Sequence, residues 1–187
     1  MTKLQIGVHL LDLIDPDPAQ IDLSAIEDSL WHAHRFSNNP MALVVRQHTW
    51  MVAELAEMMA AEPDVVRWCH HHDDHEGIIG DIPDPFKSMI YGDNPKLIAV
   101  EEGLDKAICT ARGFEYPDLS VMRRVHFFDK LAETIEWRFI LNRPFALWNR
   151  PFQNWIGEEE AKALAAKAKH LERPLRPLEV PPFGGVV

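Results

Sequence analysis

Apolar residues recur at three- and four-residue spacing along most of the chain, which is the period of an α-helix with one buried face. Val52, Leu55 and Met59 continue one such stripe, and Val125 and Phe128 belong to another. We find no stretch of alternating apolar and polar residues long enough to predict a strand. The pattern therefore predicts an all-α fold, with a helix that begins at residue 63 and others over about residues 22–36, 42–61, 94–113, 118–141 and 158–171.

Local signals mark several of these helix ends. Asp22 is placed to cap the first helix, and Pro63 suits the first turn of the helix that it begins. The pair Asn94-Pro95 opens the next predicted helix, and Gly113 is a natural residue to end it. These ends support the assignment that the apolar spacing predicts.

The length of 187 residues fits a single domain with its own hydrophobic core. We place this domain at residues 1–173, because residues 174–187 are rich in proline and glycine and predict an extended tail. Hydrophobic residues make up 47% of the chain, which argues against an intrinsically disordered protein. No apolar run approaches the roughly 18 residues that a membrane helix needs, so no membrane partner is expected.

The chain carries 29 acidic and 19 basic side chains, which gives a formal charge of −10. This balance argues against a protein that follows long nucleic acids through phosphate contacts, whereas a single nucleotide needs only a local cation. The first residues lack the pattern of a signal peptide, and Cys69 and Cys109 lie too far apart in sequence to form a disulfide framework. Both features predict a cytoplasmic location.

Three polar residues, His48, His72 and Asp129, fall on faces that the apolar pattern predicts to be buried. A single buried histidine is most often a hydrogen-bonded core residue, but a buried aspartate without a partner is costly. Asp73 follows His72 directly, so two imidazoles and two carboxylates could satisfy one another by converging on one divalent cation.

Residues 69–76 are unusually rich in histidine and carboxylate side chains. An exposed polar helix end is one interpretation of this stretch, and a metal site is the other. On helical spacing, His70, His71 and His75 point away from the face that carries His72, so we expect them to be exposed to solvent. Glu76 lies four residues after His72 and shares its face.

His48, the pair His72-Asp73 and Asp129 resemble the H…HD…D signature of HD-domain phosphohydrolases. Three further segments resemble the YfbR-type 5'-deoxynucleotidase branch of this family. They are the Arg-aromatic element that ends residues 30–36, the V-x-[EQ]-H-S segment at 45–49 and the H-D-x-x-E-x-x-x-G-D-x-P-x-P-x-K run at 72–87. The resemblance covers roughly residues 22–141, and phage dATP triphosphohydrolases of the DatZ type share the same skeleton. Phe36 stands where a tryptophan is common in the branch, and residues 38–40 also depart from it.

The resemblance implies a single helical HD domain that holds one divalent transition metal, namely Mn, Co, Fe, Ni or Zn. The implied metal ligands are His48, His72, Asp73 and Asp129. Glu76 and Asp81 would hold the attacking water and handle its proton. Arg35 and Lys87 are candidate phosphate contacts, and Phe36 could stack on a base. Relatives in this branch are commonly oligomeric, so a homo-oligomer is also implied.

Four functions remain open on this basis. The first is the release of phosphate from deoxynucleoside 5'-monophosphates by a water molecule bound to the metal. The second uses the same site to release triphosphate from a deoxynucleoside triphosphate such as dATP. The third is a catalytically idle HD domain that binds metal or acts as a scaffold, and the fourth is an acidic interaction protein whose histidines sequester metal. The four ligands and both candidate acid–base carboxylates are present, which argues against the third function. The first is favoured over the second, because three phosphates would need more cationic contacts than the nearby basic residues Arg35, Arg46, Lys87 and Lys96 provide, although an oligomer could supply others.

Overall fold

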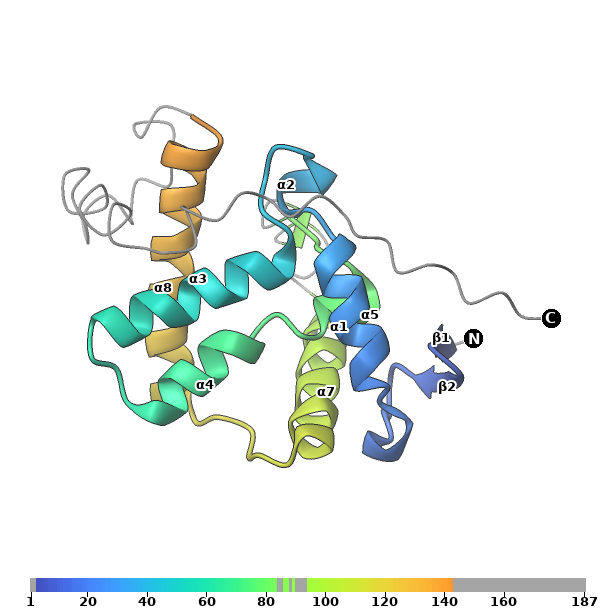
Figure 1. The fold of residues 1–187 in the computed structure, drawn as a ribbon. Coiled ribbons are helices and arrows are strands. Elements are labelled where there is room, and N and C mark those ends of the chain that lie inside the picture. Colours follow the sequence, from blue (N-terminus) through green and yellow to red (C-terminus); the bar gives the residue numbers. More distant parts are fainter. Residues whose placement is uncertain (1–2, 84–85, 88, 90–93, 143–187) are drawn as a thin grey trace.

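The structure is a computed structural model that describes residues 3–83, 86, 87, 89 and 94–142. This part of the chain is mostly helical, and its one sheet is a two-stranded hairpin, as Figure 1 shows. The predicted helical class is therefore confirmed in its coarse form. The elements are β1 (Lys3–Ile6), β2 (His9–Asp12), η1 (Pro18–Gln20), α1 (Leu23–His32), α2 (Arg35–Asn38), α3 (Val45–Met58), α4 (Pro63–His71), α5 (Glu76–Ile79), α7 (Pro95–Arg112), α8 (Leu119–Ile135) and the π-helical turn η2 (Glu136–Ile140).

The N-terminal hairpin corrects the expectation that the chain contains no strands. β1 and β2 pair antiparallel with Ile6 opposite His9, so only Gly7 and Val8 form the turn. Gly7 has a φ of +55°, which glycine adopts easily at the first position of such a turn. Each strand has only four residues, too few for alternation to stand out. The glycine-containing turn was the signal that could have predicted the hairpin.

The predicted helix-end signals are confirmed by the structure. The side chain of Asp22 accepts hydrogen bonds from two N–H groups in the first turn of α1, and that of Asn94 does the same for one N–H group of α7. Pro63 is the first residue of α4, and Gly113 ends α7 with a φ of +79°. These ends were predictable because each depends on contacts within a few residues.

The predicted extension of the first helix to residue 36 is wrong, because α1 ends at His32. In the α2 segment, residues 36–38 all have φ between +53° and +60°. These left-handed conformations are costly for residues other than glycine and cannot continue a right-handed helix. The N–H group of Arg35 donates a hydrogen bond to the carbonyl oxygen of Leu43 at 3.1 Å, which closes the base of this turn and holds Arg35 beside the start of α3.

Two hydrophobic clusters hold the helices together. The first lies between α3, α4 and α8, and the second joins the hairpin to α1, α5 and α7. Figure 1 shows α3 passing across α8, with α4 beside them. α3 contributes to both clusters, since Met51 packs in the first and Val45 in the second. His48 lies between these two positions, so the polar site predicted around it falls where the clusters meet.

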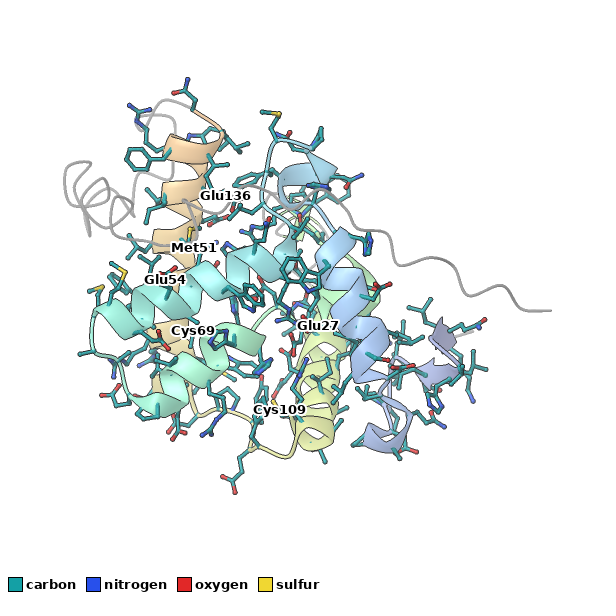
Figure 2. All side chains as sticks on the ribbon, in the orientation of Figure 1. Glu27, Met51, Glu54, Cys69, Cys109 and Glu136 are labelled. Carbon is teal, nitrogen blue, oxygen red and sulfur yellow. The ribbon has the colours of Figure 1, made fainter. Side chains whose placement is uncertain are left out.

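Cys69 on α4 and Cys109 on α7, both labelled in Figure 2, are buried free thiols. No helix that the structure describes combines the length and the apolar character that crossing a membrane requires. The helix predicted over residues 158–171 and the tail predicted at residues 174–187 lie outside the described residues.

Gly77 in α5 packs directly against α1. A Cβ atom at this position would lie 2.8 Å from both the Cγ2 and the carbonyl oxygen of Ile26. We expect Gly77→Ala to lower the free energy of unfolding by roughly 1–3 kcal/mol, because the added methyl group forces the two helices apart. Urea unfolding followed by circular dichroism measures this change.

Gly103→Ala is the matched control, because a Cβ atom at Gly103 would approach no atom closer than 3.7 Å. Gly103 lies inside α7, where alanine is favoured over glycine by about 1 kcal/mol. The two variants should therefore shift stability in opposite directions. Equal unfolding curves for both would contradict the close approach of α5 and α1.

Candidate metal centre

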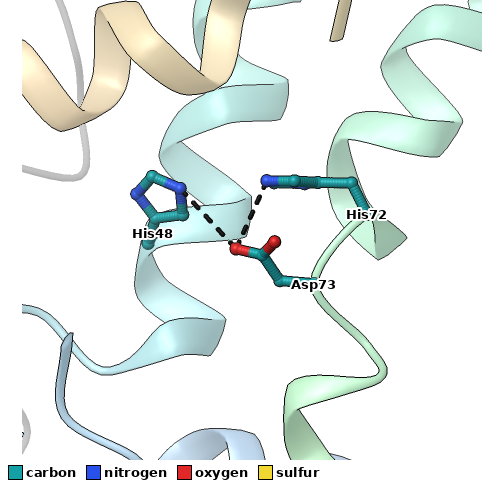
Figure 3. A group of neighbouring side chains, drawn as sticks. All are labelled: His48, His72 and Asp73. Atoms are coloured by element: carbon teal, nitrogen blue, oxygen red, sulfur yellow. Dashed lines mark ion pairs between the residues drawn. The ribbon is translucent and has the colours of Figure 1, made fainter. Parts of the chain in front are cut away.

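His48, His72 and Asp73 come together where α3 packs against α4, as Figure 3 shows. One ligand atom from each residue lies within 4.8 Å of the other two, so this group could hold a metal ion. The Oδ2 atom of Asp73 lies 3.3 Å from Nε2 of His72 and 3.8 Å from Nε2 of His48. Three of the four predicted metal ligands therefore face one another.

His72 and Asp73 directly follow the last residue of α4. The Nδ1 atom of His72 lies 2.9 Å from the carbonyl oxygen of Cys69, which can only accept a hydrogen bond, so Nδ1 carries a proton. This contact turns Nε2 towards Asp73. Nε2 of His72 is buried and has no hydrogen-bond partner among the described residues. A cation beside Asp73 would give this nitrogen a partner, so the residues present fit a metal ion.

Asp129, the fourth predicted ligand, lies on α8 outside this group of three but beside its two histidines. Its Oδ1 atom lies 3.0 Å from Nε2 of His48 and 3.9 Å from Nε2 of His72. Burial disfavours the charged carboxylate, but the hydrogen bond to His48 and the nearby ring of His72 hold the pKa of Asp129 well below its usual range. Burial likewise opposes ionisation of Asp73, yet His72 and His48 lower its pKa to about 2. Both carboxylates are therefore ionised at neutral pH and next to the imidazoles.

The charge on His72 responds to the same neighbours. Burial works against a positive charge on this ring, but Asp73 and Asp129 together raise the pKa of His72 to about 9. At neutral pH the ring therefore holds a second proton in the absence of metal. Because a metal ligand must be deprotonated, binding of a cation at Nε2 releases this proton.

Arg35, a predicted phosphate contact, is buried beside this group. Its Nη1 atom lies 3.5 Å from Oδ2 of Asp73, and its Nε atom lies 3.1 Å from Oε2 of Glu136. Burial opposes the charged guanidinium, but Glu136 and Asp73 raise the pKa of Arg35 above its ordinary value. Arg35 therefore places a permanent positive charge next to a candidate metal ligand. Glu136 was not predicted from the sequence.

Phe36, the predicted base-stacking residue, lies in the left-handed turn after α1. The centroid of its ring is 6.0 Å from that of Trp137 in η2, and the guanidinium carbon of Arg35 lies 5.8 Å from the centroid of Phe36. The turn thus packs against the end of α8. This arrangement keeps an aromatic side chain beside Arg35.

Glu76 and Asp81, the predicted acid–base residues, both carry a buried carboxylate oxygen without a hydrogen-bond partner among the described residues. Glu76 is buried in α5. Burial and the negative charges of Asp73 and Asp81 raise the pKa of Glu76 to about 8. Burial also raises the pKa of Asp81. A carboxyl group with a pKa near 8, as Glu76 has, can exchange a proton near neutral pH.

Lys87, the second predicted phosphate contact, already pairs with carboxylates. Its Nζ atom lies 3.3 Å from Oε1 of Glu101 and 3.7 Å from Oε1 of Glu76. Burial opposes its charge, but Glu76 and Asp73 raise the pKa of Lys87 above its ordinary value. Lys87 therefore neighbours the candidate base, and a phosphate that approached it would compete with Glu101.

Sequence reasoning also missed the role of Asp74, which is fully buried next to a candidate ligand. Its carboxylate lies 3.1 Å from Nη2 of Arg46, 2.7 Å from Nε of Arg112 and 3.0 Å from Nδ1 of His71. These ion pairs connect the end of α4 to α3 and α7. Because Asp74 is the chain neighbour of Asp73, the network fixes the backbone that carries Asp73.

The expectation that His70, His71 and His75 are exposed is wrong. His75 is buried, and its Nδ1 atom lies 2.9 Å from Oδ1 of Asp105 on α7. Burial opposes a charge on this ring, but Asp105 raises the pKa of His75 to about 9. His70 and His71 are half-buried. Helical spacing failed for His75 because α4 ends at His71, and the turn over residues 72–75 directs its side chain differently.

No family model matches the chain, and no curated protein matches it with significant similarity. The likeness to HD-domain phosphohydrolases therefore stays a prediction from the motifs. The small nucleotide as a partner, the homo-oligomer and the cytoplasmic location stay predictions as well. What the structure adds is a mostly helical fold in which His48, His72 and Asp73 could hold a metal ion.

Proposed function

We propose that this chain is a metal-dependent phosphohydrolase of the HD type, which releases phosphate from deoxynucleoside 5'-monophosphates. The observation that carries the proposal is the convergence of His48, His72 and Asp73, whose ligand atoms lie within 4.8 Å of one another. Asp129, with Oδ1 at 3.0 Å from Nε2 of His48, would supply the fourth ligand. Three separate segments would thus contribute to one site in the order of the HD-domain signature.

The donor set suits a divalent transition metal. Two imidazoles and two carboxylates favour Mn, Co, Fe, Ni or Zn over the oxygen-preferring ions. The buried Nε2 atom of His72, which lacks a partner among the described residues, supports the same conclusion. When bound, such an ion would polarise a phosphoryl group and lower the pKa of a water molecule.

The surrounding side chains would transfer the proton, hold the attacking water and orient the phosphate. Glu76 is the candidate proton acceptor, because one of its buried oxygens lacks a partner among the described residues and its pKa is raised to about 8. A group that titrates near the working pH is suited to general acid–base catalysis. Asp81 would help to hold the attacking water. Arg35 would orient the phosphate, since its guanidinium lies beside Asp73.

The charge balance favours a monophosphate over a triphosphate. Arg35, Lys87 and Lys130 bring positive charge to this region, and each of them already contacts a carboxylate. One phosphate, which needs little more than the metal and one cation, fits this balance better than three phosphates do. Release of triphosphate from a deoxynucleoside triphosphate such as dATP is the alternative that uses the same site.

The test is to incubate the full chain, loaded in turn with each divalent metal, with a panel of deoxynucleoside mono- and triphosphates. We expect inorganic phosphate and nucleoside from the monophosphates, separated and quantified by ion-exchange chromatography. Tripolyphosphate and nucleoside from a triphosphate would establish the alternative instead. Absence of turnover with every metal would contradict both activities and favour an idle metal-binding or scaffold domain.

A further inference from the structure

Glu136 is a fully buried carboxylate at the end of α8, where this helix approaches α2 and α3 (Figure 2). Its Oε1 atom accepts a hydrogen bond from the N–H group of Leu43 at 2.9 Å, and its Oε2 atom accepts one from Nε of Arg35 at 3.1 Å. Oε2 also lies 3.6 Å from Nδ1 of His48. A buried carboxylate is costly unless it is hydrogen-bonded, and these contacts make its burial possible.

His48 is held between two carboxylates from the same run of helix. Asp129 faces its Nε2 atom at 3.0 Å, and Glu136 faces its Nδ1 atom at 3.6 Å. The two acids are separated by about two helical turns and therefore share one face. Glu136 begins the π-helical turn η2, and turns of this kind occur frequently at functional sites. The two carboxylates of this helical run thus lie beside the two ring nitrogens of His48.

Metal binding at one nitrogen fixes the state of the other. A histidine that binds a cation through Nε2 carries its proton on Nδ1. Nδ1 of His48 is buried and has no hydrogen-bond partner among the described residues, and Oε2 of Glu136 is a carboxylate oxygen that faces it. A buried N–H group without an acceptor is costly. Glu136 therefore supplies the acceptor that the metal-binding form of His48 needs.

Glu136 also sets the direction of Arg35. With Nε held by Glu136, the two remaining nitrogens of the guanidinium lie near Asp73 and Glu133, at 3.5 Å and 3.8 Å respectively. One carboxylate thus touches both a candidate metal ligand and the candidate phosphate contact. Both contacts of Glu136 are buried.

We propose that Glu136 is a positioning residue of the metal centre. It holds His48 in the Nδ1–H tautomer with Nε2 directed to the cation, and it fixes Arg35 beside Asp73. The inference rests on the metal centre of the proposed function and adds a residue outside the predicted ligand set. Carboxylates that hold a metal-binding histidine in this way typically contribute about 10–100-fold to metal affinity.

Glu136→Gln tests the inference with the full chain. Glutamine keeps the shape of the side chain but offers one acceptor and one donor group, so it cannot accept hydrogen bonds from Leu43 at one end and from Arg35 and His48 at the other. We expect the affinity for Mn²⁺ or Zn²⁺, measured by isothermal titration calorimetry, to fall by about 10–100-fold. Thermal unfolding of the metal-free variant shows whether it is folded.

Glu133→Gln is the matched control. Glu133 lies one turn before Glu136 and contacts Arg35 and Lys130, and His48 is not among its described contacts. It should bind metal within about twofold of the wild type, well below the loss expected when a carboxylate that orients a metal-binding histidine is removed. An equal loss in both variants would overturn the proposed contact with His48, because it would reflect only the total charge of the region.

The wild-type chain provides a second test that needs no variant. Nitrogen-15 NMR of the histidine rings in the Zn²⁺-loaded protein should show His48 bound through Nε2 with the proton on Nδ1. The opposite tautomer, or undiminished affinity in a folded Glu136→Gln variant, would overturn the inference and leave the proposed function standing. Failure of the wild-type chain to bind any divalent cation would instead overturn the metal centre itself, and the inference with it.

Discussion

Asp129→Ala is expected to abolish tight binding of divalent cations and all hydrolysis that depends on them. Asp129 contacts Nε2 of His48 at 3.0 Å and Nε2 of His72 at 3.9 Å, so its removal leaves Asp73 as the one carboxylate among the candidate ligands. Partners that only orient a ligand contribute about 10–100-fold to metal affinity, so loss of a ligand should cost more than about 100-fold. Isothermal titration calorimetry with Mn²⁺ and Zn²⁺ measures this loss.

His126→Ala is the control for this variant, since His126 is an exposed residue of the same helix. It removes an imidazole that could bind metal weakly at the surface, and it should leave the affinity of the centre unchanged. If Asp129→Ala binds metal as tightly as this control does, Asp129 is not a ligand. The metal group would then consist of His48, His72 and Asp73 alone.

The sequence predicted those parts of the fold and site that depend on local or periodic patterns. Helix ends at Asp22 and Gly113 follow from hydrogen bonds and backbone angles within a single turn. His48 and Asp129 were recognisable because each places a polar group on a stripe of apolar residues. Such a contradiction within a pattern is informative, since buried polar groups need partners.

The parts that escaped prediction depend on contacts between distant segments. Glu136 lies near the end of a long helix, and nothing in its neighbourhood indicates that it accepts a hydrogen bond from the N–H group of Leu43. The burial of His75 depends on Asp105 in another helix. In both cases the packing of distant segments determines the partner. Until that packing is known, a polar stretch of sequence is predicted to be exposed.

Glu76→Gln is expected to leave metal binding intact and to lower turnover by about 10²–10⁴-fold, the usual contribution of a positioned acid or base. Glu76 is buried in α5 and has one carboxylate oxygen without a partner among the described residues. Glutamine preserves the size of the side chain but cannot accept a proton from water. The measurement is kcat for phosphate release at saturating metal, together with the metal affinity of the same sample.

The pH dependence of turnover separates this role from a structural one. A general base acts in its ionised form, so wild-type turnover should fall as the pH drops below the pKa of Glu76. Burial, Asp73 and Asp81 raise this pKa to about 8 in the metal-free protein, and a cation that neutralises Asp73 would lower it. The residual turnover of Glu76→Gln should lack this decrease at low pH. Glu115→Gln, at an exposed glutamate, should keep both the decrease and the wild-type rate. Unchanged turnover in Glu76→Gln would remove Glu76 from the mechanism and leave Asp81 as the remaining candidate base.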